Sequence, residues 1–172
     1  MYEAKDLEEY LKATKAPLLI DAFPNAALPD YYKSGDGNTI RRILQSMRVI
    51  KSPAEQALMR NAAAVGSHSF IRVIQQSRLE RSEHRLAALM EYEAKLNGAS
   101  SLSYVPVVAG GPRACIIHYT RNDQMIQDGQ LLLMDAGAMV HSYCSDITRT
   151  WPVNGRFSPA QLEIYRAVQS VQ

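Results

Sequence analysis

Apolar residues recur at helical spacing over much of the first hundred positions of the chain. The clearest stretch runs from Pro53 to about Gln76, where one helical face carries Ala57, Leu58, Ala62, Val65, Phe70, Ile71 and Ile74. Ser52, Pro53 and Glu55 predict where this helix begins, because a serine N-cap, a proline at the first helical position and a glutamate at the third form a capping box. A long amphipathic helix is therefore expected from residue 53.

Two further helices are predicted on either side of this one. The helix after it begins near Ser82 and ends at Asn97-Gly98, with a core face of Leu86, Leu89, Met90 and Leu96. The helix before it begins at Thr39 and runs to about Met47, with Ile40, Ile43 and Leu44 on one side. Nearer the N-terminus, residues 5–14 predict an amphipathic helix, residues 18–20 a short strand, and residues 24–37 a loop rich in proline and glycine.

From Ser103 onward, short apolar runs alternate with turn signals, a pattern typical of strands. We expect strands at residues 104–108, 114–119, 130–135 and 140–150, separated by turns at Gly110-Gly111-Pro112 and Asp128-Gly129 and ended by Asn154-Gly155. Ser158-Pro159 then begins a last helix that runs to about Val171. Helices followed by antiparallel strands predict an α+β fold.

Composition and charge narrow the classes of protein that this chain can belong to. Its 172 residues are 47% hydrophobic and 21% charged, a composition typical of a soluble globular domain. The net charge of +2 is too small to suggest nucleic acid or an anionic membrane as a partner. There is no membrane-length apolar run, and the mixed charges at residues 1–6 do not resemble a signal or transit peptide. Cys115 and Cys144 show no ligand spacing, so we interpret them as reduced, half-buried thiols.

Two aspartates in the strand region are the candidate chemical groups. Asp135 ends the apolar run 131–134, and Asp146 follows eleven residues later in the next strand segment. If these strands pair through a tight turn near residues 140–141, the two carboxylates come to lie opposite each other, about 5 Å apart at Cβ. Such a pair suits hard divalent ions, and two ions together can activate water and polarise a carbonyl. The alternative is structural: Asp135 caps a turn, and Asp146 pairs with Arg149.

The residues around these aspartates favour the metal hypothesis. The string Asp-Ala-Gly at 135–137 and the string Ser-Asp-Ile-Thr-Arg-Thr-Trp-Pro-Val-Asn-Gly-Arg-Phe at 145–157 closely resemble the Xaa-Pro aminopeptidases (aminopeptidase P), metallopeptidases with the pita-bread fold. Val-Val-Ala-Gly-Gly at 107–111 and Ile-His-Tyr at 117–119 match as well, and the mitochondrial-type members are the most similar. The resemblance covers about residues 40–172, so residues 51–172 are expected to form the first, N-terminal half of a pita-bread domain. Residues 1–50 are then interpreted as the remnant of an N-terminal domain with a linker helix.

The resemblance implies roles for five residues. Asp135 would be a terminal metal ligand and Asp146 a ligand that bridges two divalent ions, most often Mn²⁺. His118 would be a catalytic and substrate-binding residue beside the ions, and Thr148 and Arg149 would support the ligands from behind. The substrates implied are peptides with proline at the second position. The other histidines, His68, His84 and His141, are interpreted as structural.

The chain departs from the family pattern in the number of ligands. The family's site uses two aspartates, one histidine and two glutamates in that order, whereas after Asp146 this chain has a single acidic residue, Glu163, and no histidine. Glu163 is expected to face solvent on the last helix. The chain is therefore interpreted as a truncated form, a fragment or short isoform, with two of five ligands and no peptidase activity by itself.

Two other functions remain open from the sequence. One is a non-catalytic pita-bread module that binds proteins, and the other is a prolidase-type dipeptidase with the same metal pair. A half domain would expose an apolar sheet edge, so homo-oligomers or pairing through that edge are also expected. The chain itself encodes no localisation signal, and the resemblance implies a mitochondrial or cytoplasmic protein.

Overall fold

The structure, a computed structural model, describes residues 37–172 of the chain. The chain divides into two compact units, Met1–Lys51 and Ser52–Gln172. The helix, strand and loop predicted within residues 5–36 lie outside the described residues. In the first unit, α2 (Gly37–Val49) contains the helix predicted from Thr39 to Met47, but Ile43, Leu44 and Met47 on its apolar face are exposed. No helix among the described residues is long and apolar enough to cross a membrane.

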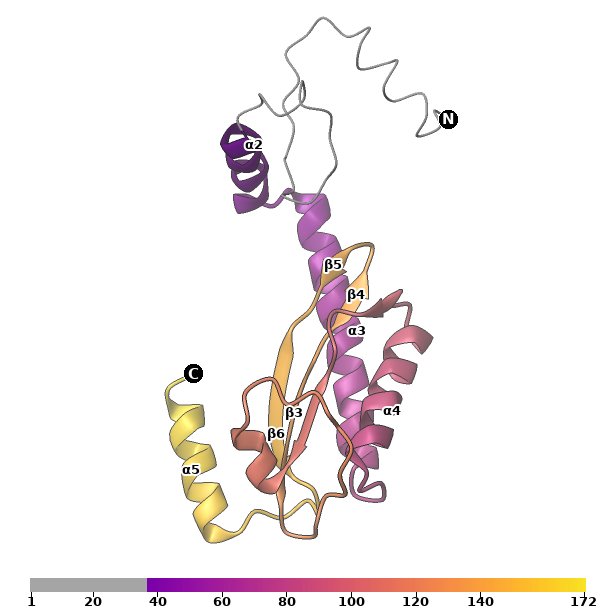
Figure 1. Cartoon of the computed structure of the whole chain (residues 1–172), viewed down its shortest axis with the longest axis vertical. Helices are drawn as coiled ribbons and strands as arrows, with labels where there is room; N and C mark the ends of the chain where they lie inside the picture. Colours follow the sequence, from indigo (N-terminus) through magenta and orange to yellow (C-terminus); the bar gives the residue numbers. More distant parts are fainter. Residues whose placement is uncertain (1–36) are drawn as a thin grey trace, which may run out of the picture. The chain divides into compact units, whose positions relative to one another are not determined.

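The second unit begins with two helices that Figure 1 shows packed side by side, α3 (Pro53–Gln76) and α4 (Glu83–Leu96). The predicted capping box starts α3: the Ser52 N–H donates to Glu55 Oε2 at 2.7 Å, and the Glu55 N–H donates to Ser52 Oγ at 3.3 Å. Ser82 caps α4, and the chain leaves that helix through Asn97 and Gly98, whose φ is +98°. Both helices lie where the sequence predicts them.

Six short strands follow, paired in two antiparallel sheets. The larger sheet has the order β2-β3-β6 and consists of Val107–Gly110, Leu131–Ala136 and Ile147–Pro152. The smaller sheet has the order β1-β4-β5 and consists of Ser101–Leu102, Ala138–Val140 and Tyr143–Cys144. The α+β prediction is confirmed.

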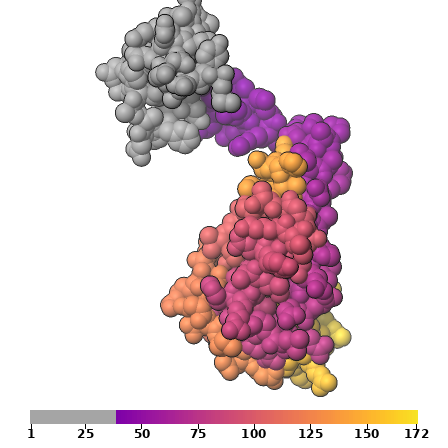
Figure 2. Space-filling view, turned by 90° about the vertical axis from the view of Figure 1, so that its right-hand side faces the viewer, coloured from indigo at the N-terminus to yellow at the C-terminus, as the bar shows by residue number. Residues whose placement is uncertain are grey.

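The main core lies between the two helices and one face of the β2-β3-β6 sheet. Alternate residues of β3 enter it, because side chains along a strand point to opposite faces. Leu132, Met134 and Ala136 are fully buried there against Phe70, Val73, Leu86, Met90 and Trp151. In the space-filling view, α4 and the chain that follows it, in magenta to rose, form much of the surface over this core (Figure 2). The other face of β3 carries Leu131, Leu133 and Asp135, which are only half-buried.

The prediction of a strand at residues 114–119 is wrong. Residues Gly111–Cys115 form a short 3₁₀-helix, η3, and a turn follows in which His118 has a φ of +54°. Ile116 and Ile117 suggest a strand, but the Gly110 N–H and Arg113 Nε just before them are bound by the side chain of Glu83, and Gly111 has a φ of +57°. Both of these isoleucines are exposed.

The strand predicted at residues 140–150 is divided into three. A two-residue turn at His141 and Ser142, both with positive φ, joins β4 to β5 as a tight hairpin, and β6 begins only at Ile147. His141 thus lies at a turn tip, as expected. Three predicted core positions, Ala57, Ile71 and Leu96, are exposed, and so are both cysteines, which were expected to be half-buried.

The last helix, α5 (Pro159–Ser170), begins at a second capping box, formed by Ser158 and Gln161. Its predicted start and end are confirmed. None of its residues is buried, and Ile164, Val168 and Val171 are exposed. The ring of Tyr165 lies 4.8 Å from that of Phe157, centroid to centroid. Few packing contacts therefore support this helix among the described residues.

Candidate functional site

Asp135 and Asp146 meet in the structure, but not through the strand pairing that the sequence suggested. The register of β3 and β6 places Asp135 opposite Thr148 and Ala136 opposite Ile147, so Asp146 lies just beyond the last pair, diagonal to Asp135. The hydroxyl of Tyr104 joins them: it lies 2.5 Å from Asp135 Oδ1 and 2.7 Å from Asp146 Oδ1. Two carboxylates thus converge on one oxygen atom.

Hydrogen bonds around Ser145 bring the two aspartates together. The Ala138 N–H donates to Ser145 Oγ at 2.9 Å, and the Ser145 N–H donates to the Ala138 carbonyl at 3.0 Å. Ser103 Oγ donates to the Ser145 carbonyl at 2.8 Å. These bonds fasten the bend that follows Asp135 to the residue that precedes Asp146, so both carboxylates lie at the same end of the larger sheet.

Tyr104 is the residue that sequence reasoning missed at this site. Its pKa is raised above the usual range, first by burial, then by hydrogen bonds to Asp135 and Asp146 and by the charges of both. The phenol therefore keeps its proton at any ordinary pH and has one proton to offer to two carboxylates. No local pattern could have indicated this role, because the partners lie 31 and 42 residues further along the chain.

The two residues predicted to support the metal ligands lie on β6, shortly after Asp146. Thr148 is paired with Asp135 across the sheet, and Arg149 Nη1 donates to the Thr148 carbonyl at 2.8 Å. The structural alternative of an ion pair between Asp146 and Arg149 is not formed in the described part of the chain. Asp146 is exposed and Asp135 half-buried, so solvent and solutes can reach both carboxylates.

His118 lies on the segment between β2 and β3, in the exposed turn after η3. The next residue, Tyr119, is buried against Val107 and Ala109 of β2. Val107 is paired with Asp135, and side chains of directly paired residues share a face of the sheet. The segment that carries His118 is therefore packed onto the sheet face that carries Asp135.

The ligand atoms at this site are of the type that a divalent ion prefers, but there are too few of them. Carboxylate oxygens are the ligands that Mg²⁺, Ca²⁺ and Mn²⁺ prefer, and here two of them point at one position. Among residues 37–172, no group of three or more His, Cys, Asp or Glu side chains is placed to hold a metal ion. Glu163 is exposed on α5, as expected, and is not part of such a group.

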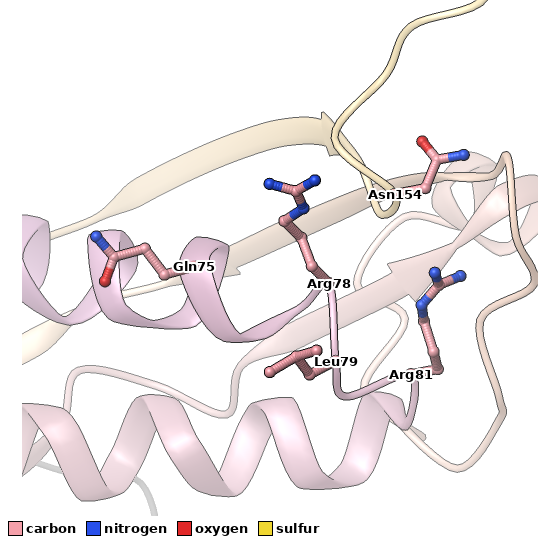
Figure 3. Close-up of a pocket in the computed structure, with 5 residues that line it drawn as sticks. All are labelled: Gln75, Arg78, Leu79, Arg81 and Asn154. Atoms are coloured by element: carbon pink, nitrogen blue, oxygen red, sulfur yellow. The ribbon is translucent and has the colours of Figure 1, made fainter.

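A separate hollow lies at the opposite end of the larger sheet (Figure 3). It is lined by Gln75, Arg78, Leu79 and Arg81, around the end of α3 and the connection to α4, and by Asn154 from the turn after β6. In Figure 3 the side chains of Arg78, Arg81 and Asn154 stand on the same side of this connection. None of the site residues predicted from the sequence lines this hollow.

Comparison with known proteins links the fold to a family. Residues 57–172 match the model of metallopeptidase family M24. The chain is 42% identical over 146 residues to the mitochondrial intermediate cleaving peptidase 55 of Arabidopsis thaliana, covering 85% of this chain and 29% of that protein. It is 45% identical over 133 residues to human Xaa-Pro aminopeptidase 3, covering 77% of this chain and 26% of that protein.

Solved structures agree with this result. A proline aminopeptidase P II from Yersinia pestis superposes with a TM-score of 0.74 at 38% identity, covering 76% of this chain and 30% of the other. The Pseudomonas aeruginosa aminopeptidase PepP gives a TM-score of 0.72 at 43% identity, with the same coverage. The predicted pita-bread architecture is confirmed, and the chain spans less than a third of the length of each of these four proteins.

Proposed function

The chain belongs to metallopeptidase family M24, and on that premise we propose that it supplies part of a dinuclear-metal site that releases the N-terminal residue of Xaa-Pro peptides. The observation that carries this proposal is the convergence of Asp135 and Asp146 on the hydroxyl of Tyr104. The named Xaa-Pro aminopeptidase among the relatives supports the choice of substrate class.

In this proposal, Asp135 and Asp146 hold two divalent ions, with Asp146 shared between them. Mn²⁺ is the ion we propose, because carboxylate oxygens are ligands that it prefers. When bound, such a pair of ions activates a water molecule and polarises the peptide carbonyl. The exposure of Asp146 leaves room for the ions and for a peptide, whereas the hydrogen bonds of Ser145 keep the two carboxylates in place.

The remaining residues act on the substrate and on the ligands. His118, on the segment packed over the face of Asp135, is proposed to donate a hydrogen bond to the substrate or to the reacting carbonyl oxygen. Thr148, opposite Asp135, is proposed to orient the carboxylates through its hydroxyl, and Arg149 to brace the Thr148 backbone.

We propose that residues 1–172 by themselves have no measurable peptidase activity. Two carboxylates are too few to fix two ions with open positions, since ligand number and geometry set the affinity. The transcript sequence past Gln172 tests whether the remaining ligands exist: a histidine and then two glutamates in the same reading frame would complete the ligand set. A reading frame that ends without them would leave the non-catalytic, protein-binding function as the better proposal.

The activity test uses the protein that carries the complete ligand set. It is expected to release the first residue from an Xaa-Pro tripeptide in the presence of Mn²⁺, and Asp146→Asn is expected to abolish this release. A matched control is Asp128→Asn, since Asp128 is an exposed carboxylate bound to Arg81 and not to the site. Cleavage of Xaa-Pro dipeptides in preference to tripeptides would instead indicate the prolidase-type function, and full activity of the Asp146→Asn variant would contradict the proposal.

A calorimetric titration with Mn²⁺ tests the ligand count in the 172-residue chain. Binding is expected to be weak, with a Kd of about 10⁻⁴ M or higher, as for sites with few ligands. Asp135→Asn and Asp146→Asn should each weaken it further, whereas Asp128→Asn should not. Tight binding of two ions by the chain alone would show that the site is complete without further ligands.

A further inference from the structure

Glu83, in the first turn of α4, is a fully buried carboxylate that the proposed chemistry does not use. It accepts four hydrogen bonds. At Oε1 the donors are the Gly110 N–H at 3.0 Å and Arg113 Nε at 2.7 Å, and at Oε2 they are the Tyr119 hydroxyl at 2.9 Å and the Gln124 N–H at 3.1 Å. An ionised carboxylate has about four acceptor positions, so both oxygens are fully satisfied.

All four donors belong to one segment, from Gly110 to Gln124, and this is the segment that carries His118. It contains almost no regular structure after η3. The backbone of Glu83 adds to the connection, because its N–H donates to the Gln124 carbonyl at 3.1 Å. Glu83 therefore binds the beginning, the middle and the end of this segment.

A second side chain fastens the same segment to the sheet. Asn122 accepts from the Val108 N–H at 2.8 Å and donates to the Pro106 carbonyl at 2.8 Å, so it extends the edge of β2. His118 and Asn122 both have φ near +50°, a left-handed conformation that is uncommon for residues other than glycine. The turn that carries His118 is thus held between Glu83 on one side and β2 on the other.

The chemistry of this anchor is unusual for a purely structural role. Removing a carboxylate from water is costly unless charge and hydrogen bonds compensate, and an apolar side chain could cover the same helix start without that cost. Arg113 compensates the charge of Glu83, and its own side chain is three-quarters buried. A directional anchor of this kind fixes where the segment lies, which a hydrophobic contact does not.

We propose that Glu83 is a positioning residue that holds the Gly110–Gln124 segment, and through Tyr119 the turn that carries His118, over the sheet face that carries Asp135. The importance of this position for catalysis rests on the function proposed above, but the placement itself does not. The Tyr119 ring packs on Val107, the partner of Asp135, and its hydroxyl binds Glu83, so this one residue connects the anchor, the sheet and His118.

The test uses NMR on the 172-residue chain and needs neither metal nor peptide. Glu83→Gln keeps the size of the side chain but removes its charge and half of its acceptor capacity. The amide of Gly110 or that of Gln124, whichever faces the new NH₂ group, is expected to lose at least about tenfold in hydrogen-exchange protection, because the remaining oxygen can accept at only one end of the segment. The ring signals of His118 are expected to shift or broaden, while the amide of Val73 in α3 stays protected. Glu91→Gln, which removes an exposed carboxylate from the same helix, is the matched control.

A second variant decides the result if Glu83→Gln unfolds the chain. Tyr119→Phe removes only the hydroxyl that joins the segment to Glu83 and leaves the ring packed against β2. A change in the His118 ring signals supports the proposal, and unchanged ring signals in this variant overturn it. Because these measurements do not depend on activity, an inactive but correctly positioned His118 would count against the proposed function and not against the role of Glu83.

Discussion

A Cβ atom built on Gly137 would lie 1.7 Å from the backbone carbonyl oxygen of Ser145. Gly137 is two residues after Asp135, and Ser145 is the residue before Asp146. The two segments that carry the carboxylates therefore touch backbone to backbone at this point, which only glycine permits. The glycine of the Asp-Ala-Gly string therefore has a structural role: because it has no side chain, Asp135 can lie close to Asp146.

Gly137→Ala is expected to destabilise the second unit by about 3 kcal/mol or more, because the new methyl group meets backbone that cannot rotate away. Gly66→Ala is the comparison, since its Cβ would meet Ser145 Oγ at 2.6 Å, a side-chain atom that can turn away at the cost of its hydrogen bonds to Ala138, whereas a backbone carbonyl cannot. Its cost should be clearly smaller. Urea unfolding followed by circular dichroism measures both, and equal stabilities of Gly137→Ala and the unmodified chain would contradict the close approach.

The raised pKa of Tyr104 predicts a specific dependence of stability on pH. The folded chain holds the phenol proton more tightly than the unfolded chain, whose tyrosines titrate near the ordinary value of 10.0. The contribution of this group to the free energy of unfolding is therefore complete below about pH 10 and declines as the pH rises further. Tyr104→Phe removes this contribution, so its stability should fall less steeply between about pH 9.5 and 11.

The measurement is a series of urea unfolding curves across this pH range for the two proteins. Tyr119 and Tyr143 also have raised pKa values, through burial and Glu83 in one case and the hydrogen bond to Glu55 in the other. Both are present in both proteins, so the difference between the two pH profiles isolates Tyr104. Parallel profiles would mean that the hydroxyl of Tyr104 is not held between the two carboxylates.

Local signals explain which elements could be predicted from the sequence. The starts of α3 and α5 were predicted correctly because each has a serine at the N-cap and a proline at the first helical position, a local signal that acts whatever surrounds the helix. Asp135 and Asp146 were identified from the residues around them. Their convergence is real, although the register that was expected to produce it is wrong.

Long-range contacts explain the elements that were missed. Ile116 and Ile117 look like part of a strand, but the segment is bound by Glu83, some thirty residues earlier, into a turn that no local pattern predicts. The shift between Asp135 and Asp146 arises because residues 138–144 form a hairpin in a separate small sheet. The role of Tyr104 also depends on a long-range contact, because the hydrogen bond from Ser103 to Ser145 brings the bend at Ser103 beside the residue that precedes Asp146.

The indole of Trp151 fastens β6 to the end of α3, and this contact can be measured. Trp151 Nε1 donates to the fully buried Ser77 Oγ at 2.8 Å, and that hydroxyl in turn donates to the Ile74 carbonyl at 2.8 Å. Trp151→Phe and Ser77→Ala are each expected to cost about 1–3 kcal/mol. A double-mutant cycle should give a coupling of about 0.5–1.5 kcal/mol, whereas additive effects would indicate that the two groups do not bond.

The two capping boxes of the chain offer a matched pair of variants with different expected results. Ser52→Ala removes the cap of α3, whose face is buried in the core, so it should lower the global stability by about 1 kcal/mol. Ser158→Ala removes the same cap from α5, which has no buried residue. It should therefore leave the global unfolding transition unchanged and reduce hydrogen-exchange protection only within α5. Hydrogen exchange and urea unfolding on both variants check this, and a global loss in Ser158→Ala as large as that in Ser52→Ala would show that α5 is coupled to the core.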